Sequence, residues 1–204
     1  SMSHELTQTE NGVEFAYALR NGVPWHGLGN PLPDFGTAGE LLDAAKLRWR
    51  VEGRPVYRVN RPEEQAEPKA LYERIPEGRE VVRVMPDGIV KPMGVIVGQD
   101  WNPLQNYEFA AFLNGIVGGD YACWDTAGSI KDGRIVFATL IPKLVPNLTI
   151  RQGDRNDLYL VGMNGHDGHH ILSVFLTLIR AVCKNTLYAG ESSAIATWRR
   201  RHTQ

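Results

Sequence analysis

The sequence predicts an α+β fold: an antiparallel sheet built from hairpins, packed against two or three helices, with an irregular N-terminal arm. Turns are the first observation, because Pro86-Asp87-Gly88 and Lys131-Asp132-Gly133 each separate two apolar runs of strand length. The second is that helix signals alternate with these hairpins along the chain. The third is length, since 204 residues suffice for one domain with its own hydrophobic core.

Residues 1–36 are rich in glycine and proline and are predicted to form the irregular arm. Within them, Trp25 and His26 lie between prolines and glycines, a pattern that regular structure does not favour. We therefore expect an ordered arm held in place by an aromatic anchor, followed by a single α+β domain over residues 37–198.

The first elements of that domain are indicated by local signals. Thr37 and Glu40 form a capping-box pattern that begins a helix. Alternating side chains over residues 55–60 are typical of a strand. Residues 61–80 are charged and contain three prolines, so we expect an exposed loop or an insertion there.

The second half begins with a polar loop over residues 98–106, which leads into a helix predicted from Tyr107 to Val117. The second hairpin occupies residues 121–142, and a polar loop follows over 149–157. A strand is then expected from Leu158 to Met163. The apolar segment after the next turns, which continues to Ala189, predicts a long helix.

Composition sets limits on compartment and partners. The formal net charge is −1, so the overall balance favours neither nucleic acid nor a membrane surface. No uncharged apolar run reaches the roughly 18 residues of a membrane span. Cys123 and Cys183 lie in apolar surroundings without metal-type spacing, which predicts reduced core thiols in a cytosolic protein. We expect no cofactor and no membrane partner.

Four phrases of the sequence carry a resemblance to a known family. They are residues 24–29, residues 127–134, Asn164-Gly165-His166-Asp167-Gly168, and residues 180–189. With these phrases in this order, the chain resembles the phage/plasmid-like protein family, a domain of unknown function of bacteriophages, plasmids and integrated elements. The resemblance implies the cytoplasm of a bacterial host cell and brings no established activity.

The chain departs from the family pattern at Gly165 and His169, where family members more often carry serine. Residues 199–204 form a basic tail, and its Arg201-His202-Thr203 resembles the next phrase of the family, which normally precedes a further helical region. The resemblance therefore predicts that the natural protein continues beyond Gln204.

The strand expected from Leu158 to Met163 is followed by a cluster of polar side chains. They are His166, Asp167, His169 and His170. Imidazole and carboxylate groups suit zinc or iron, so a metal-dependent enzyme centred on this turn is one interpretation. The other is structural, with Asp167 accepting hydrogen bonds from nearby backbone amides in a strand-to-helix turn. We expect the structural interpretation and no bound metal.

Arg180, Lys184 and Asn185 are candidates for contacts with nucleic acid. On a helix, Arg180 and Lys184 share one face and clamp two phosphates, while Asn185 pairs with a base edge. The alternative buries Arg180 against a carboxylate such as Asp125 or Asp167 and uses the residues after Lys184 to cap the helix end.

Two further segments carry aromatic or basic side chains. Trp101 and Asn106 form an aromatic and polar loop suited to stacking on unpaired bases, although a loop tryptophan also serves as an anchor into the core. The run after Trp198 is either a phosphate-binding patch or a solvated helix end. The candidate nucleic-acid-binding residues are Arg180, Lys184, Asn185, Arg199, Arg200, Arg201, Trp101 and Asn106.

Enzymatic motifs are sparse. The sequence contains no glycine-rich phosphate loop and no nucleophile elbow, and spacing places no carboxylate pair for acid–base work. These absences give little support to an enzyme. The resemblance to proteins of mobile elements, together with the basic side chains of residues 178–204, leads us to expect a non-enzymatic protein that binds single-stranded nucleic acid in recombination or replication. A metal-dependent enzyme and an interaction module directed at a host factor are the alternatives, and homo-oligomers are compatible with each.

Overall fold

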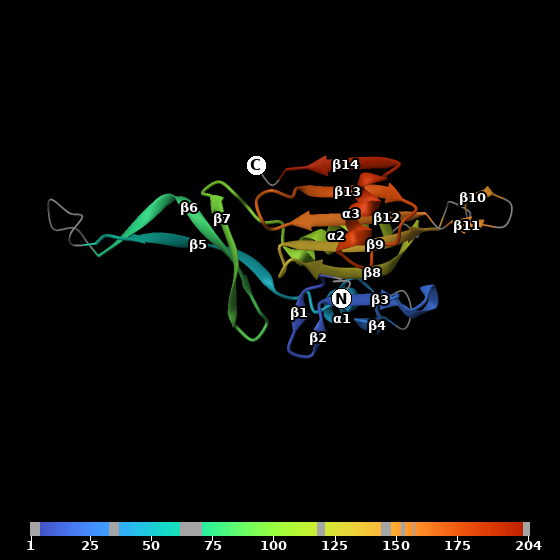
Figure 1. The fold of residues 1–204 in the computed structure, drawn as a ribbon, viewed down its shortest axis with the longest axis horizontal. Helices are drawn as coiled ribbons and strands as arrows, with labels where there is room; N and C mark the ends of the chain where they lie inside the picture. The colour runs from blue at the N-terminus through green and yellow to red at the C-terminus, as the bar shows by residue number, and fades with distance from the viewer. Residues whose placement is uncertain are drawn as a thin grey trace.

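The computed structural model describes residues 5–32, 37–61, 71–117, 121–143, 148–151, 154–156 and 158–201. A body of sheet and helices carries a long three-stranded wing that extends to one side (Figure 1). The helices are α1 (Ala38–Ala44), α2 (Asn106–Val117) and α3 (Lys184–Ser192), with a 3-10 turn at Leu19–Asn21. The mixed α+β class is confirmed.

The body is organised around a seven-stranded sheet of order β14-β13-β12-β9-β8-β3-β4. Neighbouring strands are antiparallel except β3 and β4, which are parallel, so the expectation of a wholly antiparallel sheet is wrong at this edge. The strands are β3 (Phe15–Ala18), β4 (Asn30–Leu32), β8 (Ala122–Ile130), β9 (Ile135–Pro142), β12 (Tyr159–Gly165), β13 (Leu172–Thr177) and β14 (Ala196–Arg200).

Both faces of this sheet carry a hydrophobic cluster, because alternate side chains of a strand point to opposite faces. Phe15 and Tyr17 belong to one cluster with Leu187 of α3. Ala16 belongs to the other, with Leu113 of α2. Helices therefore lie on both faces, and all of β8 is buried, as expected of strands covered on two sides.

The predicted hairpin of β8 and β9 is confirmed. Its turn has left-handed backbone at three successive residues, with φ of 53° at Lys131, 56° at Asp132 and 86° at Gly133. Glycine adopts this region without steric cost, as predicted for the third position. The capping box of α1 is confirmed as well, because the side chains of Thr37 and Glu40 each accept the backbone N–H of the other.

The wing is a second sheet of order β5-β6-β7, formed by β5 (Arg50–Val59), β6 (Tyr72–Val84) and β7 (Val90–Gly98). The expectation of a loop over residues 61–80 is wrong from Tyr72 onward, whereas residues 62–70 lie outside the described part of the chain. Cross-strand pairing explains the difference, because Arg58 and Glu73 face each other across β5 and β6 in a 2.8 Å ion pair.

A buried ion pair attaches the wing to the body. Arg83 of β6 donates from Nη1 to Glu14 Oε1 at 2.7 Å, and the Ser129 hydroxyl donates to the other carboxylate oxygen. Burial raises the pKa of Glu14, while Arg83 and Ser129 act to lower it. The Arg83 guanidinium also lies 5.5 Å from the centre of the Trp49 ring. Removing one partner would leave a buried charge unpaired.

The N-terminal segment is more regular than predicted. A small hairpin of β1 (Gln8–Thr9) and β2 (Gly12–Val13) precedes β3, and both β3 and β4 belong to the main sheet. Strand β3 is apolar and buried, and it pairs with β8. This pairing gives the segment a regular structure that its glycine content alone does not predict. The prediction of an irregular arm is therefore wrong for these strands.

The anchor of this segment is His26 and not Trp25. His26 Nδ1 accepts the backbone N–H of Leu28 at 3.0 Å, so the N–H of its Nε2 donates to the Val182 carbonyl at 3.0 Å. The Trp25 side chain is 61% exposed. The histidine thus links the N-terminal segment to the residues before α3.

The predicted long helix after residue 163 is also wrong. Residues 172–177 form β13, which pairs with β12 and β14, and α3 begins at Lys184. Thr186 lies at the start of this helix, where its Oγ1 accepts the backbone N–H groups of Val182 and Cys183 at 2.9 and 3.0 Å. Thr186, which was expected with Asn185 to cap the end of a helix, therefore caps the beginning of α3.

Smaller findings complete the fold. Two short strands, β10 (Leu148–Arg151) and β11 (Asp154–Asn156), pair where a loop was expected. Cys123 and Cys183 are buried and free, as predicted. In the described ranges, no helix has the length and apolar character needed to cross a membrane.

Candidate nucleic-acid interface

The predicted binding residues do not form one surface. Lys184 and Asn185 lie on α3, which packs against one face of the seven-stranded sheet. Trp101 and Arg200 line cavities on the other face, where α2 packs. The proposed clamp and the proposed stacking loop are therefore separate features.

Arg180 has a structural role. Its Nε and Nη2 donate to the two carboxylate oxygens of Asp125 at 2.7 Å each, and Nη1 donates to the carbonyls of Asn21 and Gly22. Asp125 is fully buried and also accepts from Asn21 Nδ2 at 2.8 Å. The alternative prediction, with Arg180 buried against a carboxylate, is confirmed. This bidentate pair ties the N-terminal segment to β8.

Lys184 and Asn185 do not extend this arrangement. Arg180 precedes α3, so the prediction that it shares a helical face with Lys184 is wrong. The Lys184 ammonium donates to Glu5 at 2.7 Å, and the Asn185 side chain is exposed. The charge of Lys184 is therefore already partnered.

The run of three arginines is divided by the two-residue period of β14. Trp198 and Arg200 stand opposite Val174 and Leu172, which belong to the hydrophobic cluster on the α2 face. Arg199 points to the other face, where it donates to Glu191 of α3 at 3.2 Å. The expectation of a solvated helix end is wrong, because this segment is an edge strand.

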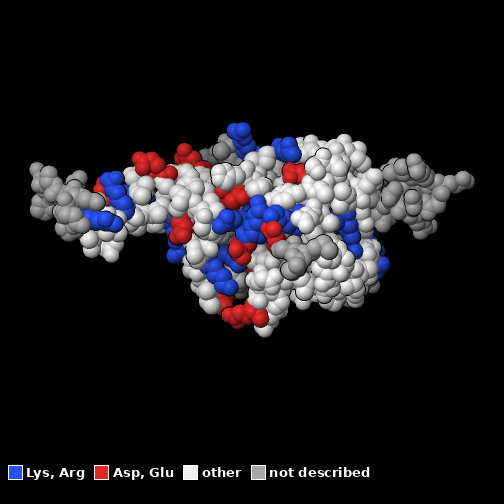
Figure 2. Space-filling model, in the orientation of Figure 1, with Lys and Arg blue, Asp and Glu red and all other residues white. Residues whose placement is uncertain are grey.

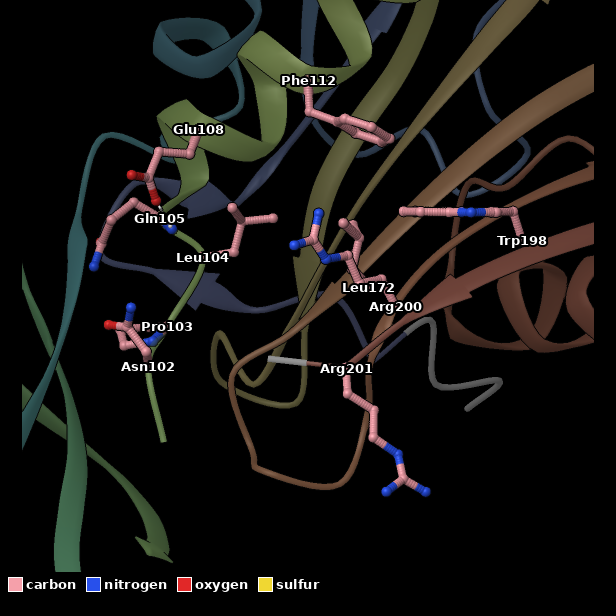
Figure 3. Close-up of a pocket in the computed structure, with 10 residues that line it drawn as sticks. All are labelled: Asn102, Pro103, Leu104, Gln105, Glu108, Phe112, Leu172, Trp198, Arg200 and Arg201. Atoms are coloured by element: carbon pink, nitrogen blue, oxygen red, sulfur yellow. Dashed lines mark hydrogen bonds between the residues drawn. The ribbon is translucent and has the colours of Figure 1, made fainter. Parts of the chain in front are cut away.

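A cavity of about 520 Å³ opens beside Trp198 and Arg200 (Figure 3). The rings of Phe112 and Trp198 stack within it, with centroids 5.7 Å apart and planes inclined by 24°. These side chains are 40% and 46% exposed. The other side chains that line it are Asn102, Pro103, Leu104, Gln105, Glu108, Leu172 and Arg201.

A second cavity, of about 650 Å³, shares Arg201 with the first. The segment from Gly98 to Trp101 lines one side and the turn from Gly168 to Ile171 lines the other. We call the two cavities together the groove. Trp101 packs against the core cluster, which confirms its role as an anchor, and its indole N–H has no hydrogen-bond partner in the described residues.

Buried polar side chains hold the loop of the groove in place. Asn106 Nδ2 donates to backbone carbonyls in residues 47–49, which leaves its Oδ1 to accept the Nε2–H of His166 at 3.0 Å. Asn164 Nδ2 donates to the Leu104 carbonyl at 2.9 Å. Asn106 is 1% exposed, so it positions the loop and does not reach a ligand.

The histidine turn has the structure predicted for a backbone cap. Asp167 Oδ1 accepts the backbone N–H groups of His169 and His170 at 3.0 and 2.8 Å, and Oδ2 accepts the Nδ1–H of His170 at 2.6 Å. Burial acts to raise the pKa of Asp167, but the His170 side chain and the two backbone amides hold it well below its usual range. In the described segments, no group of three or more His, Cys, Asp and Glu could hold a metal.

Arg200 and Arg201 differ from the other basic candidates because they make no hydrogen bond or ion pair with the described residues. Figure 3 shows Arg200 directed between Leu104 and Trp198. Glu108 lies across the groove, where its carboxylate accepts the backbone N–H of Gln105 at 2.8 Å. Among the basic candidates in the described segments, the two without an ion pair therefore lie on the β14 side of the groove.

A family model described as a domain of unknown function (DUF932) matches residues 94–204. The chain belongs to the DUF932 family. All the side chains that line the groove fall within the matched residues, whereas β1 to β6 lie outside them. Comparisons with curated proteins and with solved structures gave no match.

Two glycines shape the groove of this DUF932 protein. A Cβ at Gly165 would lie 2.4 Å from both Cβ and O of His170, so a serine there would displace the turn. Gly168 has a φ of 72°, and a Cβ there would lie 2.9 Å from Val97. Glycine at position 165 thus allows His170 to lie close to the end of β12.

Sequence reasoning missed Phe112 and the role of Trp198. Phe112 lies beside the buried stripe of Phe109 and Leu113 on α2, and this offset was the available signal. The alternation of Trp198 and Arg200 was the signal for β14. The two rings stack because α2 and β14 lie side by side in the fold. The sequence of this DUF932 protein does not show that these distant segments are in contact.

Proposed function

We propose that this DUF932 protein binds single-stranded nucleic acid in the groove. The observation that carries the proposal is the exposed pair of Phe112 and Trp198 beside the unpartnered Arg200. Every base has a π-face, so an aromatic ring adds about 1–3 kcal/mol per stacked base with little dependence on sequence. A guanidinium beside that ring is suited to the neighbouring phosphate.

The positive charge of Arg200 and Arg201 in the groove supports this binding, whereas the net charge of the whole chain does not. Lys and Arg are intermingled with Asp and Glu over the wing and body (Figure 2), in keeping with a formal net charge of −1. A general attraction to polyanions is therefore weak, and affinity depends on Arg200, Arg201 and the rings. A single strand fits these features better than a duplex, whose bases are stacked and covered.

The biological setting belongs to the same proposal. The phrases shared with phage and plasmid proteins favour a role in the recombination or replication of a mobile element within a bacterial cell. Such processes produce exposed single strands, and a groove that stacks bases without reading their edges suits strands of any sequence.

Fluorescence anisotropy with labelled oligonucleotides tests the proposal. Thymidine 20-mers and single-stranded RNA should bind more tightly than a duplex of the same length. If Arg200 and Arg201 neutralise two phosphates, the slope of log K against log salt should be about −1.4. No binding of any single strand at low salt would contradict the proposal, and so would a preference for the duplex.

A further inference from the structure

We propose that the groove also cleaves single-stranded RNA, with His170 as general base and His169 as general acid. This inference rests on the proposed function, because it needs a strand bound in the groove. It goes beyond that function by assigning a reaction and a substrate class, ribonucleic acid, to the turn of residues 167–170.

The first argument is the orientation of His170. Both oxygens of Asp167 are occupied, one by two backbone N–H groups and the other by the Nδ1–H of His170 at 2.6 Å. With Nδ1 donating to a carboxylate, Nε2 of the neutral ring carries the lone pair that accepts a proton. A histidine oriented by a carboxylate in this way is the usual form of a general base.

The second argument is position. His169 and His170 both line the 650 Å³ cavity, together with Trp101 and Arg201. The side chain of His170 is 27% exposed, so it is open to a ligand. Its ring stacks on Tyr188 with centroids 6.4 Å apart. Two imidazoles in one cavity provide one group to accept a proton and another to donate one.

The reaction balances without a further reactant. Nε2 of His170 takes the proton of a ribose 2′-hydroxyl while the O2′–P bond forms and the P–O5′ bond breaks. The leaving O5′ receives a proton from protonated His169. The products are a 2′,3′-cyclic phosphate and a 5′-hydroxyl, and no atom is oxidised or reduced. Arg201 stabilises the charge that develops on the phosphoryl oxygens.

A DNA 20-mer with one internal ribonucleotide provides the test, incubated in EDTA with the full chain. Cleavage should occur only on the 3′ side of the ribonucleotide and leave a 2′,3′-cyclic phosphate, detected by mass spectrometry. All-DNA and 2′-O-methyl strands should bind equally and stay intact. Binding is measured on the same samples by anisotropy.

Variants assign the roles. His170→Ala and His169→Ala should each slow cleavage by about 10²-fold or more while strand affinity changes little. Added imidazole should restore part of the activity of His170→Ala, which a merely structural role would not allow. Asp167→Asn, a change in a positioning residue, should also slow cleavage. Asp132→Asn, in the exposed β8–β9 turn, is the matched control and should leave the rate unchanged.

The outcomes separate the two proposals. Binding without cleavage overturns this inference and leaves single-strand binding intact. Equal cleavage by the wild type and by His170→Ala, purified in parallel, identifies a contaminating nuclease and also overturns it. Cleavage that requires added Mg²⁺ contradicts acid–base catalysis by the histidines. Absence of strand binding contradicts both proposals.

Discussion

Arg180 and Arg200 were predicted to do the same work, and the structure gives them opposite surroundings. The guanidinium of Arg180 is shared between the buried Asp125 carboxylate and two backbone carbonyls. Arg200 makes no hydrogen bond or ion pair with any described residue and faces the groove. The comparison teaches that an arginine in the sequence does not by itself indicate a binding site. An arginine paired with a buried carboxylate stabilises the fold, whereas one without such a partner is open to a ligand.

The largest expected effect concerns the structural member of this comparison. Arg180→Ala should lower the free energy of unfolding by about 3–5 kcal/mol, because it leaves the fully buried Asp125 without its counterion. Urea denaturation followed by circular dichroism measures the change. The double variant with Asp125→Asn should recover part of the loss. A loss below about 1 kcal/mol in the single variant would show that the pair is not structural.

The next effect concerns the ring beside Arg200. Trp198→Ala should weaken single-strand binding by about 1–3 kcal/mol, because a stacking surface is lost. Trp25→Ala is the matched control, since Trp25 is a more exposed tryptophan, at 61%, outside the groove. Anisotropy titrations measure both. Equal losses in the two variants would contradict the location of the site.

A smaller effect is expected in the salt dependence. Replacing Arg200 and Arg201 with glutamine should flatten the slope of log K against log salt by about 1.4, since two phosphate contacts are lost. The unfolding midpoint should not change. Arg199→Gln is the control on the same strand, because Arg199 points to the other face and pairs with Glu191. If Arg199→Gln altered the slope as much, the placement of Arg199 and Arg200 on opposite faces of β14 would be contradicted.

The smallest effect is expected at Lys184. Its ion pair with Glu5 is partly exposed, at 27% and 41% of the two side chains. Lys184→Gln should therefore change the free energy of unfolding by less than about 1 kcal/mol and leave strand affinity unaltered. A marked loss of strand affinity in this variant would show that Lys184 contacts the nucleic acid.

Local features of the fold were predictable from the sequence. The Lys131-Asp132-Gly133 turn and the Thr37–Glu40 capping box depend on neighbouring residues, and both were found. Strand β13 was mistaken for helix because a strand buried on both faces shows no two-residue alternation, and only Leu176 in β13 is partly exposed. The charged residues of β6 were mistaken for a loop because their composition does not show that they pair with the preceding strand, β5.

The site was less predictable because it is made by distant contacts. Sequence alone allowed either Asp125 or Asp167 as the partner of Arg180, and the two carboxylates in fact serve different elements. The cap formed by Asp167 was predicted because it lies within four consecutive residues. The stack of Phe112 on Trp198 joins α2 to the edge strand β14, and no local pattern in either segment indicates the other.

Photo-crosslinking tests the central claim most directly. A single strand that carries 5-iodouracil or 5-iodouridine is bound to the full chain, irradiated, and mapped by mass spectrometry of the peptides. We predict crosslinks at Trp198, Phe112 or Trp101, the aromatic side chains of the groove. Crosslinks confined to the α3 face around Lys184, or to the wing, would contradict the assignment of the groove as the binding site.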